Sequence, residues 1–369
     1  MLLIRNAHVY APENLGKMDI LICEEKILAV KANIAITYDD IEEIDLGGKV
    51  VCPGWIDQHV HIIGGGGEDG FASQIPEISM RDCLMNGMTT VVGLLGTDGI
   101  VKSPDALVAK TKALREVGMS AYCLTGSYAV PTRTVTGSVG KDIAMIDEVI
   151  GVKCAISDHR SSCVQWQELA RLASSAYTAS LLAKKPGYVH LHTGRGKEGL
   201  KPVFQVLEET DLPISQFRPT HMSNQPKDAV KFANMGGRID FTAGHDVETL
   251  HQVLDQVDPK LVTVSTDANG SMPIWDEHNH LIGMGIGKLD TMAATLQQLL
   301  KLGRTWTEVL PLVTSNVADA LGLTGKKGVI HPQADADLLV WKDGSLDMVI
   351  ARGKIVVKDG LFCGKDYYM

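Results

Sequence analysis

Short apolar runs alternate with amphipathic stretches from about residue 50 to residue 267 of the chain. The runs are rich in aliphatic and β-branched side chains, and each is too short to be a buried helix, so each predicts a buried strand. There are eight such runs, at residues 50–56, 89–95, 120–125, 149–157, 187–193, 217–221, 238–242 and 261–266.

The stretches between the runs carry helix signals. Ser103-Pro104-Asp105 provides a start for a helix over residues 106–116, and Gly140-Lys141-Asp142 precedes a helix over 143–148. Two further helices are predicted at 291–302 and 307–320. Eight strand-then-helix units predict an α/β fold, a (β/α)8 TIM barrel. A doubly wound open sheet is the alternative, but the regularity of the eight repeats favours a closed barrel.

Both ends of the chain lack a helical period and show short β-like pieces instead. They lie at residues 2–4, 18–23, 26–30 and 41–45, and again at 328–330, 337–341, 346–351 and 354–358. When two β-rich tails flank a barrel, the simplest arrangement is that their strands pair with each other in one small domain. We therefore expect a small β-sandwich domain built from residues 1–50 and 324–369, and a catalytic barrel over residues 51–323.

Polar residues stand at or near the downstream ends of five of the apolar runs. They are His59 and His61, Lys153, His192, His221 and Asp267. In a parallel barrel the carboxyl ends of all strands meet on one rim, where barrel enzymes build their active sites. Four imidazoles, a lysine and a carboxylate on one rim are what a two-metal hydrolase requires. His59 and His61 are two residues apart, so they share one face of their strand.

Three of these positions have competing interpretations. Lys153 in an apolar strand could be structural, could form a Schiff base, or could add carbon dioxide and give a metal-bridging carbamate; the histidines elsewhere favour the carbamate. Of His190 and His192, which share a face, we choose His192 as the ligand and His190 as a lining residue. Asp267 could be a metal ligand, a proton shuttle or a helix cap. The remaining histidines are expected in loops or on the surface: His8, His159, His245, His251, His278, His280 and His331.

Composition narrows the function classes. The 369 residues are 45% hydrophobic and carry a formal net charge of −9, which argues against binding to nucleic acid or to an anionic membrane. No apolar run approaches the length of a membrane span, and Arg5-Asn6 interrupts the apolar start, so no signal peptide is expected. The seven cysteines are scattered and odd in number. They indicate reduced thiols and a cytoplasmic protein.

Several segments of the chain resemble the amidohydrolase superfamily. The likeness is carried by the strand-end residues above and by residues 52–54, 57–68, 91–98 and 150–160, and residues 334–340 resemble the accessory β-sandwich of that superfamily. More narrowly, residues 52–54, 57–68 (Asp57-Gln58-His59-Val60-His61 through Glu68), 91–98 and 150–160 closely resemble the isoaspartyl dipeptidases.

The resemblance implies a site with two Zn²⁺ ions per chain. His59, His61 and Asp267 would hold one ion, His192 and His221 the other, and carboxylated Lys153 and a hydroxide would bridge them. Tyr128 would polarise the scissile carbonyl. The implied substrate-binding residues are Gly66, Glu68, Thr97, Tyr128, Arg160, Asn224 and Ser271. Asn224 stands where the family pattern has a second arginine, so weaker binding of one substrate carboxylate is expected.

The reaction implied is hydrolysis of the β-aspartyl peptide bond of a dipeptide, by a homo-oligomer with no nucleic-acid or membrane partner. A cyclic amide hydrolase of the dihydroorotase or hydantoinase type is the nearest alternative, but such a substrate brings no ammonium group for Glu68. A barrel that binds partners without catalysis is a third possibility, which is disfavoured because no ligand position has been lost.

Overall fold

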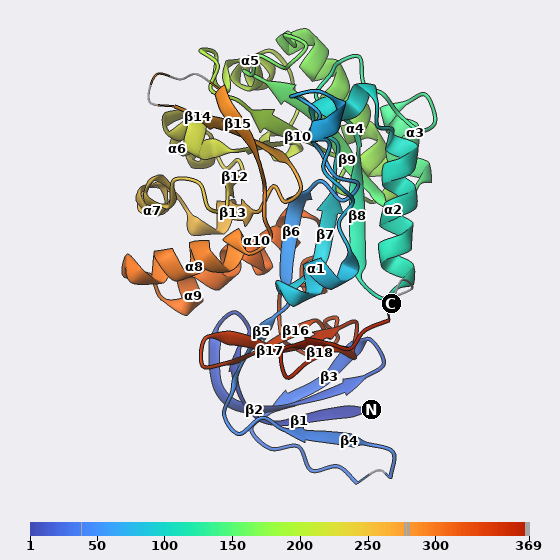
Figure 1. Ribbon diagram of the computed structural model, residues 1–369, viewed down its shortest axis with the longest axis vertical. Helices are drawn as coiled ribbons and strands as arrows, with labels where there is room; N and C mark the ends of the chain where they lie inside the picture. The colour runs from blue at the N-terminus through green and yellow to red at the C-terminus, as the bar shows by residue number, and fades with distance from the viewer. Residues whose placement is uncertain (38, 277, 279–280, 366–369) are drawn as a thin grey trace.

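Eight parallel strands form a TIM-barrel-like domain, and strands from both chain ends form a β-rich domain beside it (Figure 1). The computed structural model describes residues 1–37, 39–276, 278 and 281–365. The barrel strands are β6 (Trp55–Val60), β7 (Met88–Gly93), β8 (Ser120–Gly126), β9 (Val149–Ile156), β10 (Tyr188–Thr193), β11 (Phe217–Thr220), β12 (Ile239–Thr242) and β13 (Val262–Ser265). The predicted α/β barrel architecture is confirmed.

Hydrogen bonds connect the barrel strands in chain order. Strands β6 to β11 form one parallel sheet, and β12 pairs in parallel with β13. The Thr220 hydroxyl of β11 donates to Asp240 of β12 at 2.6 Å. A parallel bridge between Val60 and Ala268 brings the chain after β13 back to β6. The order of the strands around the barrel therefore follows their order in the sequence.

The first predicted barrel strand, residues 50–56, is in fact two strands. Gly54 divides the run into β5 (Val50–Pro53), which belongs to the β-rich domain, and β6, which begins the barrel. Strand β5 pairs with β1 and with β16, whereas β6 pairs with β7. The prediction was wrong here because both strands are buried and apolar, so hydrophobicity does not mark the passage from one domain to the other.

Helices lie around the outside of the barrel (Figure 1). They are α1 (Met80–Met85), α2 (Pro104–Glu116), α3 (Val139–Met145), α4 (Trp166–Ala183), α5 (Lys201–Glu209), α6 (Pro226–Asn234), α7 (Val247–Leu254), α8 (Thr291–Lys301), α9 (Trp306–Val309) and α10 (Ser315–Ala320). Short 3-10 turns are η1 (Phe71–Ser73), η2 (Thr97–Ile100), η3 (Ile214–Gln216), η4 (Met222–Asn224), η5 (Pro259–Leu261) and η6 (Leu310–Val313). Among the described residues, none of these helices has both the length and the apolar character of a bilayer span.

Two helix predictions need correction. Helix α3 begins at Val139 rather than Ile143, because the Ser138 hydroxyl accepts a hydrogen bond from the Lys141 amide and caps the earlier turn. The helix predicted over 307–320 is divided into α9, η6 and α10. Pro311 lies at the division, where it cannot donate a backbone hydrogen bond to a continuous helix.

The β-rich domain consists of strands from both ends of the chain. They are β1 (Leu2–Tyr10), β2 (Asn14–Cys23), β3 (Lys26–Lys31), β4 (Glu42–Asp45) and β5 at one end, and β16 (Leu338–Lys342), β17 (Ser345–Ala351), β18 (Lys354–Lys358) and β19 (Leu361–Phe362) at the other. Buried Ile4, Ile20, Val340 and Ile350 share one core. The strand predicted at residues 328–330 is absent, since Gly328 forms a bend and the next two residues have no regular secondary structure. The domain limits of 1–50 and 324–369 stay a prediction.

A hairpin of β14 (Ser271–Trp275) and β15 (Leu281–Ile286) lies at the end of the barrel away from the β-rich domain (Figure 1). The sequence analysis assigned no strand to this hairpin, and Ser271 opens its first strand. The strand signal is weak because a proline, Pro273, interrupts the apolar run. The hairpin brings Ser271 to the rim at which the barrel strands end.

Asp240, a buried aspartate on β12, links four barrel strands. Its carboxylate accepts hydrogen bonds from Gln58 at 2.7 Å, Thr220 at 2.6 Å, Thr263 at 2.7 Å and Ser265 at 2.6 Å. Burial raises the pKa of this carboxyl, and the four donors act in the opposite direction. Two of the donors precede His59 and His221 directly in the chain, so this network fixes the strand ends beneath the rim.

Asp240→Ala is expected to lower the free energy of unfolding by about 3 kcal/mol or more, because four buried donors lose their acceptor. Urea denaturation followed by circular dichroism measures the loss. Asp211→Ala, at an exposed aspartate, is the control and should change stability by no more than about 0.5 kcal/mol. Equal stability of the two variants would contradict the structural importance of the network.

Candidate active site

The predicted strand-end residues meet at the carboxyl rim of the barrel. His59 lies in β6 and His61 directly follows it, while Lys153 lies in β9 and His192 in β10. The other two residues, His221 after β11 and Asp267 after β13, have left-handed backbone conformations, with φ of 61° and 54°. All six side chains are buried. The structure therefore brings together the residues that the sequence analysis grouped on one rim.

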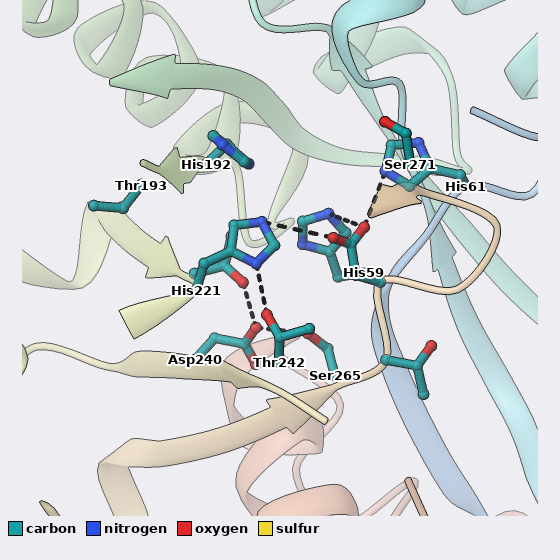
Figure 2. A network of polar contacts seen from close by, with 12 residues as sticks. His59, His61, His192, Thr193, His221, Asp240, Thr242, Ser265 and Ser271 are labelled. Atoms are coloured by element: carbon teal, nitrogen blue, oxygen red, sulfur yellow. Dashed lines mark hydrogen bonds and ion pairs between the residues drawn. The ribbon is translucent and has the colours of Figure 1, made fainter. Parts of the chain in front are cut away.

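Four imidazoles stand in a row across the rim (Figure 2). The ring centres of His61 and His59 are 5.7 Å apart, those of His59 and His221 are 5.0 Å apart, and those of His221 and His192 are 4.5 Å apart. His192 therefore lies at the far end of the row from His61.

Asp267 faces the middle of this row. Its Oδ1 lies 3.2 Å from His59 Nε2 and 3.1 Å from His61 Nε2, and its Oδ2 lies 3.9 Å from His221 Nε2. Burial opposes ionisation, but the three nearby imidazoles together hold the pKa of Asp267 well below its ordinary value. The rim thus presents an ionised carboxylate among nitrogen donors.

This donor set fits a divalent metal ion. Ligand atoms of His59, His221 and Asp267 all lie within 4.8 Å of one another. His221 Nε2 is buried with no hydrogen-bond partner among the described residues, while the Thr242 hydroxyl lies 2.6 Å from its Nδ1. His59 Nδ1 is likewise 3.0 Å from His190 Nε2. Imidazoles oriented through one ring nitrogen, with the other directed at a carboxylate, have the form of metal ligands.

Lys153 adjoins the same row. Its Nζ lies 3.0 Å from His59 Nε2, and the side chain is fully buried. Burial lowers the pKa of this lysine to about 7. A substantial fraction of the amine is therefore neutral near pH 7, which is the form that can add carbon dioxide. His190, interpreted from the sequence as a lining residue, contacts His59 through the pair of ring nitrogens described above.

His192 has both ring nitrogens engaged by other side chains. The Tyr128 hydroxyl lies 2.7 Å from Nδ1, and Asp158 Oδ2 lies 2.8 Å from Nε2. Asp158 is also held by Arg160 through two contacts of 2.9 Å. The sequence interpretation missed Asp158, although it lies between the end of β9 and Arg160, where a rim residue could have been expected. The ligand role of His192 stays a prediction.

A cavity of about 450 Å³ opens beside the row, and it is lined by residues that follow several strands. In its wall Glu68 accepts hydrogen bonds from Arg160 at 3.0 Å, Thr97 at 2.6 Å and Ser271 at 2.9 Å. Gly66 lines the same cavity and has a φ of 84°, which favours glycine. The structure thus brings these five predicted substrate residues into one wall.

Asn224 lies on another part of the cavity wall. Its Nδ2 donates to the Thr193 carbonyl at 3.2 Å, and its Oδ1 accepts from Arg195 Nε at 3.2 Å. The sequence analysis did not single out Arg195. Of the histidines assigned to loops, His159 and His245 line the cavity, and His280 lies outside the described residues.

Known proteins of several activities are similar to this chain. A β-aspartyl dipeptidase from Fervidobacterium islandicum AW-1, solved in complex with the β-Asp-Leu dipeptide, is 38% identical, with a TM-score of 0.93 and coverage of 99% of both chains. A deacetylase from Enterococcus faecalis is 26% identical over 92% of this chain and 89% of its own length. An adenine deaminase from Brucella anthropi is 23% identical over 94% of this chain.

The chain spans only 56% of the length of that adenine deaminase. The model of the amidohydrolase family matches residues 218–356, a segment that includes His221 and Asp267. Together with the β-aspartyl dipeptidase, which matches over 99% of both chains, this match supports one enzyme family for the fold. The chain belongs to the amidohydrolase family.

Proposed function

We propose that this protein is a zinc-dependent hydrolase of the β-aspartyl peptide bond in dipeptides. The observation that carries the proposal is the Glu68–Arg160 ion pair in the cavity wall, beside the row of imidazoles and Asp267. An anion and a cation in contact suit a substrate group that itself carries both charges close together.

A β-aspartyl dipeptide has such a group. Its peptide bond uses the side-chain carboxyl of aspartate, so the α-ammonium and the α-carboxylate remain free on one carbon atom. Glu68 would bind the ammonium, and Arg160 would bind the carboxylate through Nη1, the nitrogen that faces Glu68, while Asp158 holds the Nε and Nη2 edge of the guanidinium. An α-aspartyl dipeptide lacks this pair of free groups, and a cyclic amide brings no ammonium. The full-length similarity to a β-aspartyl dipeptidase supports the same substrate class.

In this proposal His59, His61 and Asp267 would hold one Zn²⁺, His192 and His221 would hold the other, and carboxylated Lys153 would serve as a ligand to both. When bound, the two ions would lower the pKa of the attacking water and polarise the scissile carbonyl. His192 would exchange its contact with Asp158 for that role, and Asp158 would keep its two contacts with Arg160. The neutral form of Lys153 favours its carboxylation.

The protein groups would then handle protons and the developing negative charge. Asp267, ionised and directed into the row, would accept the proton of the attacking water and deliver it to the leaving amine. Burial raises the pKa of Tyr128 well above its ordinary value, so its hydroxyl stays protonated and can donate to the oxyanion. Both groups lie at the cavity that would hold the dipeptide.

Purified protein is expected to hydrolyse β-Asp-Leu and to leave α-Asp-Leu intact, because only the first carries the ammonium for Glu68 and the carboxylate for Arg160 on one carbon atom. Release of leucine, followed by an amine-reactive assay, measures the rates. Dihydroorotate and a hydantoin should be at least about 100-fold poorer substrates, because neither brings an ammonium group to pair with Glu68. Faster turnover of either cyclic amide would overturn the substrate assignment and favour the cyclic amide hydrolase.

Lys153→Ala is expected to lower the metal content from about two ions per chain to one or fewer, because the bridging anion is lost. Activity should fall by at least about 100-fold and recover in part with a small added carboxylate. Elemental analysis and the β-Asp-Leu assay measure the two effects. The control is Lys141→Ala, an exposed lysine on α3. Native metal content and turnover in Lys153→Ala would make the lysine merely structural.

Asp267→Asn is expected to lower kcat by about 10²- to 10⁴-fold, the usual contribution of a general acid–base group. Circular dichroism should show an intact fold, and metal content is measured in parallel to separate proton transfer from metal loss. A decrease of less than about tenfold would assign the proton transfer to another group, and His159 would be tested first because it lines the cavity.

A further inference from the structure

We infer that Arg195 supplies the charged contact for the carboxylate of the leaving residue, in place of the arginine that is absent at position 224. The inference rests on the proposed function, since it assigns the second carboxylate of the same dipeptide. Arg195 lies in the loop between β10 and α5, one loop away from Asn224, and both residues line the cavity.

Asn224 orients this arginine. Its Oδ1 accepts from Arg195 Nε at 3.2 Å, and its own Nδ2 is fixed on the carbonyl of Thr193 at 3.2 Å. An asparagine held in this way is a rigid acceptor for one edge of a guanidinium group. Among the described residues, no hydrogen bond or ion pair occupies the terminal Nη groups of Arg195. Two donors therefore remain for a carboxylate.

The loop that carries Arg195 is anchored on both sides. The amides of Gly194 and Gly196 donate to the carbonyls of Ile156 and Ser157, at 3.2 and 2.6 Å. Gln225 donates to the carbonyls of Gly194 and Gly196, at 3.2 and 3.0 Å. A Cβ at either glycine would collide with the backbone of Ser157, so these two positions require glycine. The side chain of Arg195 is thus exposed, while the backbone that carries it is held in place by hydrogen bonds.

The barrel order separates Arg195 from the Glu68 group. Glu68, Thr97 and Ser271 follow β6, β7 and β13, which are neighbours around the barrel, and Arg160 reaches Glu68 from the loop after β9. Strands β10 and β11, which precede Arg195 and Asn224, are four places from β6 and β7 in an order of eight. By strand order Arg195 thus lies across the rim from Glu68, whereas Arg160 reaches Glu68 from the loop after β9, beside β10.

A β-aspartyl dipeptide also carries charge at both ends. If Glu68 and Arg160 hold the zwitterionic aspartyl end, the scissile amide lies over the imidazoles, and the leaving residue extends toward β10 and β11. Its carboxylate then meets Arg195. The expectation of weaker binding of one substrate carboxylate is revised accordingly, because the neighbouring loop would provide the missing charge.

The test compares β-Asp-Leu with β-Asp-leucinamide, in which a neutral amide replaces the leaving carboxylate. Arg195→Gln is expected to raise KM for β-Asp-Leu by about ten- to one-hundredfold with little change in kcat, because the contact binds ground and transition states alike. KM for the amide should stay unchanged, so the variant loses the preference for the acid. Arg195→Lys should restore part of it.

Lys197→Gln is the matched control, since it removes an exposed cation two residues further along the same loop that does not line the cavity. Asn224→Ala should give a smaller increase in KM that disappears in the Arg195→Gln background, as coupled neighbours do. If wild-type protein prefers the acid and Arg195→Gln keeps that preference, the inference is overturned and the proposed function stands. If wild-type protein cleaves neither substrate, the proposed function fails.

Discussion

The site depends on one constraint, the burial of an ionised carboxylate among imidazoles. Asp267 lies within 3.2 Å of two histidine nitrogens and is buried. Its negative charge must therefore be balanced by groups that the barrel holds in place. The neighbouring parts of the structure meet this need. Thr242 and His190 orient two of the imidazoles, and Asp240 fixes the strand ends beneath them. Lys153, with its lowered pKa, borders the same group.

The charged side chains of the rim follow different strands, so they lie at different places around it. The centre presents nitrogen donors and one carboxylate, and the wall near β6, β7 and β13 presents the Glu68–Arg160 pair. The wall near β10 and β11 presents Arg195 beside Asn224. A substrate with charges at both ends and an amide between them is complementary to this distribution. In the proposed function the barrel would select for substrate length and charge together, while the chemistry would stay at the centre.

The sequence predicted the barrel and the central residues because both follow from local rules. Buried strands are apolar, and residues such as His221 and Asp267 that directly follow them must lie on one rim. No such rule gives the partners of residues that lie in loops. The sequence analysis therefore missed the contact of Asp158 with His192 and the contact of Arg195 with Asn224. The sequence analysis also predicted β5 and β6 as one strand, because the residues of both are apolar and buried. The hairpin of β14 and β15 was missed because a proline obscured its pattern.

Anomalous diffraction at the zinc edge, from crystals grown with zinc, tests the central claim most directly. The account predicts two peaks per chain, one bounded by His59, His61 and Asp267 and the other by His192 and His221, with density for a carbamate on Lys153 Nζ. It also predicts that His192 Nε2 has left Asp158. A single peak elsewhere in the protein, or an unmodified Lys153 that still donates to His59 beside two bound ions, would contradict it.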